Sequence, residues 1–183
     1  KRPDWPVEYL LVTSASRVPD IAAHKASLEC GSTTNTASRR EQVDYTIPHF
    51  VSSARFLVKK GAGIARIEDL AGKRVISTKG TTSLTEFRRR NKELTLNATV
   101  LEADDHADAF AAVVAGKADA FVMDDVLLFG QRALAAKPDD YVVLPEVISK
   151  EPLGPVVRHG DDDWFDIVKW ALYTMVNAEE LGV

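Results

Sequence analysis

Two stretches rich in hydroxyl side chains contain the residue types that hold a small anion. The first, residues 77–83, lies between a predicted strand and a predicted helix, and Thr81, Thr82 and Ser83 stand where that helix begins. Free backbone N–H groups and the positive end of the helix dipole meet there, so a carboxylate would be held well. The stretch has neither glycine pattern of the nucleotide-binding loops. An ordinary helix N-cap explains the same residues and stays open.

The second stretch, residues 31–36, is followed by Arg39. A guanidinium group can donate two parallel hydrogen bonds to a carboxylate, which a lysine cannot do. The spacing therefore predicts a second carboxylate contact from this part of the chain. A surface arginine in a turn is the simpler explanation of Arg39 taken alone.

Acidic residues and a histidine follow predicted strands. Asp124 and Asp125 come directly after one strand, and open α/β sheets bind ligands beyond the carboxyl ends of their strands. One of these carboxylates could pair with an ammonium group, and capping of the next helix explains them equally well. His106, at a strand-to-helix junction, could contact a polar ligand or be a surface histidine. The other histidines and the single Cys30 lack metal-ligand spacing, so we expect no metal site and no cofactor, and we interpret Cys30 as a small buried apolar residue.

Composition narrows the class of protein. The chain has 183 residues, 45% of them hydrophobic, which suits one domain or two small lobes sharing a cleft. Its formal net charge of -4 argues against a nucleic-acid or anionic-membrane surface. No apolar run approaches the roughly 20 residues that span a bilayer, and we expect no signal peptide within these residues.

The elements that must position these residues follow from periodicity. Alternating strands and helices with short loops predict a parallel α/β lobe over residues 72–145. A final helix, starting near residue 162, carries an apolar stripe that includes Trp164, Val168 and Met175. Strands are predicted at 7–13, 28–31, 50–59, 74–77, 99–102, 118–123 and 141–144. Helices or helical turns are predicted at 38–42, 67–70, 81–90, 105–115 and 126–136.

Five motifs together resemble one family. They are residues 29–35 with Arg39, residues 54–60, 69–73, 80–82 and 123–125. In order and spacing they closely resemble the glutamate/aspartate-binding proteins of bacterial ABC transporters, from about Val7 to the end of the chain. Residues 145–183 are more similar to the general L-amino-acid-binding branch, which takes a wider range of side chains.

This resemblance implies an α/β fold of the periplasmic-binding-protein type, with two α/β lobes and a hinge. The family's opening strand, its ligand-contacting loop and its first helix have no counterpart in the sequence, so the first lobe is expected to be incomplete. The expected division is a partial first lobe at 1–58, a second lobe at 59–148, and a return segment with a C-terminal helix at 149–183.

The resemblance also implies a ligand site. Ser32 and Thr34 are expected to bond the ligand's main-chain groups, and Arg39 its α-carboxylate. Thr82 would reach the same carboxylate and Asp124 the α-ammonium. His106 matches a histidine that contacts the side-chain carboxylate in the acidic-ligand branch. Weaker additions complete the expected set: Arg55, Thr81 and Ser83.

The implied function is extracytoplasmic binding of an acidic or polar L-amino acid for uptake by an ABC transporter. The implied partners are that amino acid and a membrane permease, with no nucleic acid, and the implied location is the periplasm. A homodimer through the incomplete lobe is a further expectation. A degenerate receptor lobe acting as a sensor or interaction module is the main alternative. An enzyme resembling the cyclohexadienyl dehydratases, with His106 and Asp124 as acid and base, is a weaker one, and we expect no enzyme.

Overall fold

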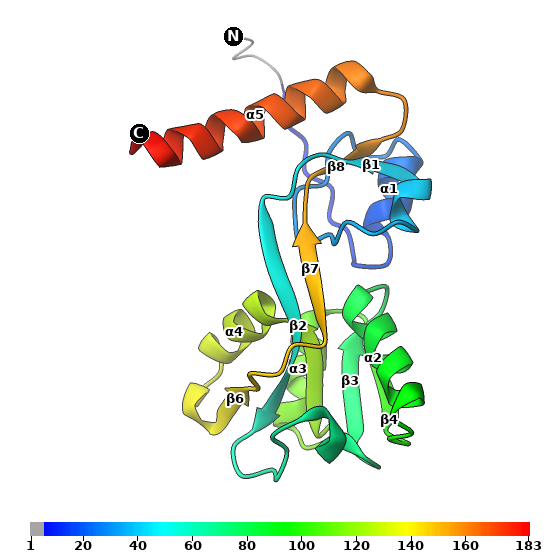
Figure 1. Ribbon diagram of the computed structural model, residues 1–183, viewed down its shortest axis with the longest axis vertical. Helices are drawn as coiled ribbons and strands as arrows, with labels where there is room; N and C mark the ends of the chain where they lie inside the picture. Colours follow the sequence, from blue (N-terminus) through cyan, green and yellow to red (C-terminus); the bar gives the residue numbers. More distant parts are fainter. Residues whose placement is uncertain (1–5) are drawn as a thin grey trace.

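The computed structural model describes residues 6–183, which form a larger and a smaller lobe joined by two long strands (Figure 1). The joining strands are β2 (Phe50–Lys59) and β7 (Ser149–Leu153), which pair antiparallel over residues 50–54 and 149–153. No helix among these residues is both long enough and apolar enough to cross a membrane.

The larger lobe is built on a six-stranded sheet of order β4-β3-β5-β2-β6, with β7 paired to β2 beyond this path. The strands β3 (Arg74–Thr78), β4 (Thr99–Ala103) and β5 (Ala120–Asp124) are parallel, as the alternation predicts. The expectation of a wholly parallel sheet is wrong, because β2 enters from the smaller lobe and runs antiparallel between β5 and β6 (Tyr141–Val143).

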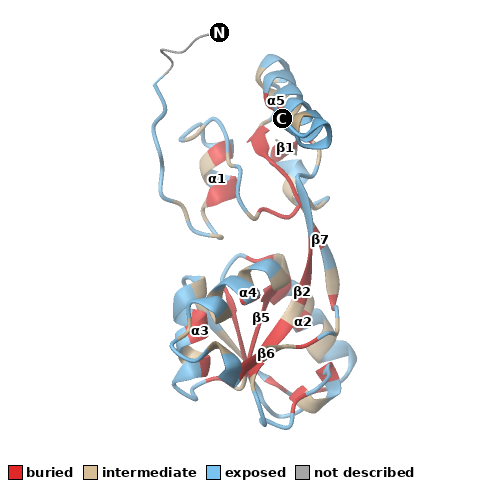
Figure 2. Ribbon diagram, turned by 90° about the vertical axis from the view of Figure 1, so that its left-hand side faces the viewer, coloured by how far each residue is buried: buried red, intermediate tan, exposed pale blue. Residues whose placement is uncertain are grey.

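Helices cover both faces of this sheet, and each face has its own core. On one face, Phe87 of α2 (Thr82–Glu93) packs with Phe56 and Val122. On the other, Phe110 of α3 (His106–Val114) and Leu128 of α4 (Asp125–Ala133) pack with Phe121. The buried residues concentrate along these strands (Figure 2). Such a rigid sheet fixes where its loops emerge.

Most predicted elements of the larger lobe are confirmed. The strand at 50–59 and the helical turn η2 (Ile67–Leu70) have the predicted bounds, and the turn at 38–42 holds η1 (Arg39–Glu41). The other strands and helices of this lobe shift by a few residues at their ends. A further turn, η3 (Pro138–Asp140), precedes β6.

The smaller lobe contains α1 (Arg17–Ala22), β1 (Val43–Tyr45), β8 (Val156–Arg158) and α5 (Asp162–Leu181). The strands β1 and β8 form a two-stranded antiparallel sheet, and Ile21, Tyr45 and Val156 lie in its small core. This core is much smaller than those of the larger lobe.

Four expectations for the smaller lobe are wrong. Residues 7–13 form no strand, since no neighbouring strand accepts their hydrogen bonds, and Tyr9 and Leu11 are 95% and 98% exposed. Residues 28–31 make only an isolated bridge, from Glu29 to Val156. The predicted stripe of α5 buries Val168 but leaves Met175 exposed. Cys30, expected to be buried, is exposed because residues 28–31 run along the surface.

The predicted lobe boundary at residue 58 falls inside β2, which pairs with β5 and β6 as far as Val58 and Lys59. The six-stranded sheet therefore already includes residues from Phe50 onward. The division of the chain into lobes at 1–58, 59–148 and 149–183 stays a prediction.

Candidate functional site

The site lies where the carboxyl ends of β3, β4 and β5 face the smaller lobe. A groove of about 420 Å³ opens between the lobes, within the range of small-molecule sites. Its lining includes Thr34 and Arg39 from the smaller lobe, Thr82 from α2 and Glu151 from β7. Both lobes and a connecting strand therefore contribute side chains to one groove.

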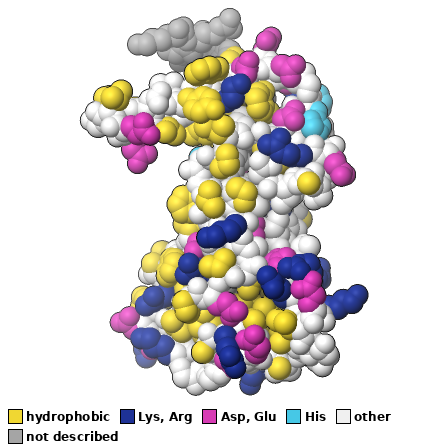
Figure 3. Space-filling view, viewed as in Figure 1, with side chains coloured by type: hydrophobic (Ala, Val, Ile, Leu, Met, Phe, Trp, Pro, Cys, Tyr) yellow, Lys and Arg dark blue, Asp and Glu magenta, His cyan; other side chains and the backbone are white. Residues whose placement is uncertain are grey.

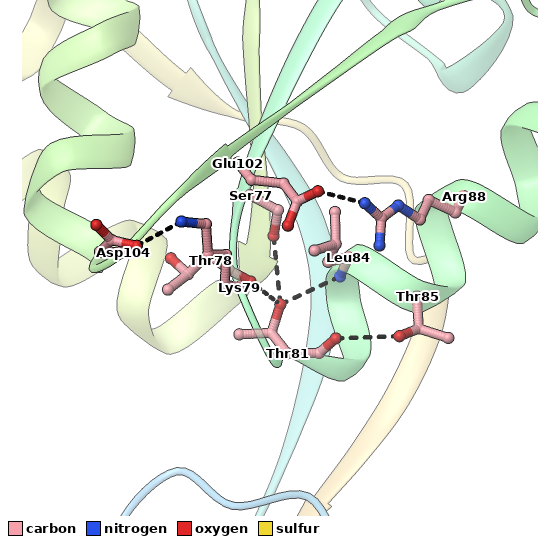
Figure 4. Close-up of polar contacts among 9 residues, drawn as sticks. All are labelled: Ser77, Thr78, Lys79, Thr81, Leu84, Thr85, Arg88, Glu102 and Asp104. Atoms are coloured by element: carbon pink, nitrogen blue, oxygen red, sulfur yellow. Dashed lines mark hydrogen bonds and ion pairs between the residues drawn. The ribbon is translucent and has the colours of Figure 1, made fainter. Parts of the chain in front are cut away.

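The turn after β3 is fixed by Thr81 (Figure 4). Its hydroxyl donates to the Thr78 carbonyl at 2.7 Å and accepts from the backbone N–H of Leu84 at 3.2 Å, which caps α2. The N-cap interpretation is thus confirmed for Thr81. Because both hydrogen-bonding roles of this hydroxyl are used, Thr81 positions the helix terminus rather than offering a free side chain.

The next two residues, Thr82 and Ser83, each donate to a buried carboxylate. The Thr82 hydroxyl lies 2.6 Å from Oε2 of Glu151, and the Ser83 hydroxyl lies 3.2 Å from Oδ1 of Asp124. Since Thr82 donates its single proton to Glu151, the 3.2 Å contact between the Thr34 and Thr82 hydroxyls has Thr34 as donor. This contact joins the two lobes.

Arg39 also joins the lobes. Its Nη1 donates to the Thr34 carbonyl at 2.8 Å and its Nη2 to the Gly80 carbonyl at 3.0 Å. The guanidinium group is thereby held at the groove, next to the start of α2. Carbonyl oxygens are weaker acceptors for guanidinium than a carboxylate is, so the same N–H groups suit a bound anion.

Ser32 accepts a hydrogen bond at 3.3 Å from Nη1 of Arg17, a residue that the sequence interpretation missed. Arg17 is 7% exposed, its Nη1 lies 4.0 Å from Glu29, and its Nε has no hydrogen-bond partner among the described residues. Burial lowers the pKa of Arg17, and Glu29 opposes that shift. A buried guanidinium group with spare donors is a second candidate anion contact.

His106 begins α3, and its Nδ1 lies 2.8 Å from the Thr78 hydroxyl. Burial lowers the pKa of His106, and the positive charge of Arg17 lowers it further. Both effects favour a neutral imidazole, which can accept or donate a hydrogen bond to a polar ligand.

Asp124 ends β5 and is 1% exposed. Although it stands at the N-cap position of α4, its side chain makes no capping hydrogen bond, so the capping alternative does not apply. Burial raises the pKa of Asp124 to about 6, and the negative charge of Glu151 adds to that shift. Asp124 is not in the lining of the groove, and neither are Ser32, Ser83 and His106.

Arg55 is the one predicted site residue that the structure sets apart. Side chains alternate between the two faces of the sheet along β2. Ala54 stands opposite Asp124 and shares its face, so the neighbouring Arg55 points to the other face of the sheet. Its Nε lies 3.2 Å from Oδ2 of Asp125, and Asp125 also accepts from Ser52. The other eight predicted residues gather around the interface of the two lobes.

Glu151 lines the groove and Arg17 contacts Ser32 in the smaller lobe, and neither residue was predicted. Arg17 follows the hydroxyl run Thr13, Ser14 and Ser16, the same pattern as residues 31–36 before Arg39, and that repetition was a usable signal. Glu151 had no such signal, because only the pairing of β7 with β2 brings it to the groove. The described residues contain no group of three or more His, Cys, Asp or Glu side chains suited to a metal ion.

Comparison with known proteins identifies relatives along almost the whole chain. The family described as "Bacterial extracellular solute-binding proteins, family 3" matches residues 1–182. An L-glutamate/L-aspartate-binding protein of Pseudomonas aeruginosa is 41% identical over 170 residues, which are 93% of this chain and 56% of that protein. A general L-amino acid-binding periplasmic protein of Rhizobium johnstonii is 40% identical over 131 residues, 70% of this chain and 38% of that protein. The chain spans about half the length, or less, of these curated relatives.

Solved structures agree on the fold. A periplasmic binding protein from Brucella ovis with glutathione bound superposes with a TM-score of 0.89 at 29% identity, covering 96% of this chain and 56% of that one. An ancestral arginine-binding protein bound to arginine has a TM-score of 0.86 at 27% identity, covering 93% of this chain and 74% of that one. The predicted periplasmic-binding-protein-like fold is therefore confirmed.

Proposed function

The chain belongs to family 3 of the bacterial extracellular solute-binding proteins, and from that premise we propose that the interface of its two lobes, at and behind the groove, binds an acidic or polar L-amino acid for uptake by an ABC transporter. The observation that carries the proposal is the arrangement of charge across the lobes. Arg39 and Arg17 lie on the smaller-lobe side, and Asp124 and Glu151 lie on the larger-lobe side. A zwitterion has the matching pair of charges.

The proposed roles are those that the family resemblance implies, and the contacts of each side chain support them. Arg39 donates to the ligand's α-carboxylate, and the backbone N–H groups at the start of α2 are the second anion contact, since the hydroxyls of Thr82 and Ser83 already donate to carboxylates. Asp124 accepts from the α-ammonium group. Ser32 and Thr34 bond the ligand's main-chain atoms, and neutral His106 contacts a polar side chain. Arg17 adds a positive charge that favours an acidic ligand.

Binding closes the two lobes about β2 and β7, and the closed form docks on a membrane permease. The names of the relatives support a periplasmic location and a role in transport without catalysis. No residue of the groove is assigned a chemical step. Arg55 is left out of the ligand shell, since it is paired with Asp125.

Isothermal titration calorimetry with L-glutamate, L-aspartate, L-glutamine and an aliphatic amino acid tests this proposal. We expect binding of the acidic or polar ligands and a loss of roughly 100-fold or more in affinity for Arg39→Ala, since truncating one partner of a buried charge pair costs about 3 kcal/mol. Arg40→Ala is the matched control, because Arg40 is exposed and bonds Asn35 and the Tyr45 carbonyl instead. No heat with any ligand from a folded sample, or equal losses in both variants, would overturn the proposal.

A further inference from the structure

Two buried carboxylates, Asp124 and Glu151, lie on the same face of the larger sheet. In the strand register Ala54 stands opposite Asp124 on one side and opposite Ser149 on the other. Residues directly opposite each other in a sheet point to the same face, and Glu151, two residues beyond Ser149, points there as well. The residue between the two strands is an alanine, which leaves room for both acidic side chains to lean over it.

Hydroxyl groups, rather than cations, hold these two carboxylates. Ser83 donates to Asp124, and Thr82 donates to Glu151. A second hydroxyl, that of Ser149, donates to the other oxygen of Glu151. Among residues 6–183 neither carboxylate has an ion-pair partner within 4.0 Å, although the two are 1% and 2% exposed. Buried acids without a cationic partner are costly to ionise together.

The surroundings of Asp124 include charges of both signs. Glu151 and Asp125 disfavour its ionised form, and Arg17 on α1 favours it. The negative charge of Asp125 is compensated by the ion pair with Arg55, whereas Glu151 has no cationic partner among the described residues. Burial lowers the pKa of His106 on α3, which favours its neutral form. The guanidinium group of Arg39 donates to the Thr34 and Gly80 carbonyls. Glu151 is therefore the principal negative neighbour of Asp124.

We propose that Glu151, next to Asp124 on the same face of the sheet, adds to the effect of burial in favouring the protonated form of Asp124, so that ligand binding exchanges the proton on Asp124 for the ligand's α-ammonium group. Glu151 is a positioning residue here, acting on the ligand through Asp124 and through the hydroxyl of Thr82. The proposal rests on the proposed function, because it concerns the same amino-acid site. The exchanged proton passes to the solvent.

The exchange has a defined pH window. Because the pKa of Asp124 is raised to about 6, its protonated form dominates well below pH 6 and its carboxylate dominates well above it. An ammonium group bound at Asp124 favours the carboxylate, so binding releases a measurable fraction of a proton per ligand near pH 6 and very little at pH 8. Affinity falls as the pH drops below 6, because the proton and the ammonium group compete for one site.

Proton release is measured by titrating the protein with L-glutamate at pH 6 in two buffers that differ in ionisation enthalpy, with a repeat at pH 8. We expect a measurable fraction of a proton per ligand for the wild type at pH 6 and much less at pH 8. In Glu151→Gln the negative neighbour is removed while an amide oxygen still accepts from Thr82. That variant should release less than half as much, and its affinity should fall less steeply from pH 8 to pH 5.

The matched control is Glu102→Gln, which removes a carboxylate paired with Arg88 on the outside of α2. Its proton release should equal that of the wild type. Equal release from wild type and Glu151→Gln would overturn this inference while leaving the proposed function intact. If the wild type binds none of the amino acids at pH 8, the proposed function itself fails. A Glu151→Gln protein that lost affinity equally at every pH would show a purely structural role and also contradict the inference.

Discussion

At the scale of single residues, Asp124 shows how a binding site opposes stability. Its carboxylate is buried at the end of β5 with one hydroxyl donor, and its pKa is raised by burial and by Glu151. The pKa of an aspartate in an unfolded chain is about 3.9, so the folded protein holds the proton more tightly. Stability therefore falls as the pH rises through the window from about 4 to 6.

Asp124→Asn should stabilise the fold at pH 7.5. The substitution removes the buried charge and keeps an oxygen for Ser83, so the free energy of unfolding should increase by up to about 3 kcal/mol. At pH 4 the wild-type side chain is already neutral, and the difference should nearly vanish. Urea unfolding at both pH values measures this. An equal effect at the two pH values would contradict the electrostatic explanation, and the variant should bind amino acids weakly.

The sequence identified residue types better than it identified their partners. Arg39 and Thr82 line the groove between the lobes and Asp124 lies buried near it, and their ligand roles stay a prediction. Arg55 and Thr81 stand in equally suggestive motifs, yet one pairs with Asp125 and the other caps α2. Which face of β2 carries Arg55 depends on the register of that strand, and a single sequence does not state the register.

At the scale of secondary structure elements, the site depends on where α2 begins. The turn at residues 78–81 ends β3 and presents Thr82 and Ser83 to the two buried carboxylates. The hydroxyl of Thr81, 4% exposed, links strand to helix at this point. Any fraying of the first helical turn would move both donors.

Thr81→Ala should lower the free energy of unfolding by about 1–2 kcal/mol, because it removes an N-cap and a buried donor to the Thr78 carbonyl. Thr85→Ala is the comparison, since its exposed hydroxyl bonds only the Thr81 carbonyl within the helix. That change should stay within about 0.5 kcal/mol. Chemical denaturation of both variants provides the measurement, and similar losses in the two would contradict the assigned role of Thr81.

Elements with local signals were predicted, and elements that depend on distant pairing were not. The larger lobe alternates strands and helices over short loops, so the hydrophobic periodicity of its sequence was enough to predict most of its elements. The strand β7 contains Pro152, and β8 has three residues. Both exist because β2 and β1 pair with them from a hundred residues away. Residues 7–13 have a good strand pattern and no partner, so they stay extended and exposed.

At the scale of the whole molecule, the lobes contact each other through backbone as well as side chains. Gly80 has φ = +74°, and a Cβ built on it would lie 2.5 Å from Cα of Ala15 in the smaller lobe. Only glycine fits this approach. Hydrophobic side chains gather over α5, where Trp170 and Met175 are exposed (Figure 3). Association of two chains through the smaller lobe stays a prediction.

Gly80→Ala should push the lobes apart at Ala15 and remove the Arg39 contact with the Gly80 carbonyl. Gly116→Ala is the matched control, with φ = +71° and no atom within 4 Å of the added methyl group. Both variants bear the backbone strain of about 1 kcal/mol. Only Gly80→Ala should lose further stability and increase the radius of gyration in small-angle X-ray scattering. Identical behaviour of the two variants would show that the contact with Ala15 is unimportant.

The ladder between β2 and β7 has a consequence for the order of events in binding. Asp124 and its partner Ala54 belong to the sheet of the larger lobe, so rotation of the lobes about β2 and β7 leaves Asp124 in place. Arg39 arrives only with the smaller lobe. We therefore expect an amino acid to dock first by its ammonium end in a bimolecular encounter, and its carboxylate to be captured in a later step that is independent of concentration. In this order of events, Asp124 determines the association rate of the ligand and Arg39 determines its dissociation rate.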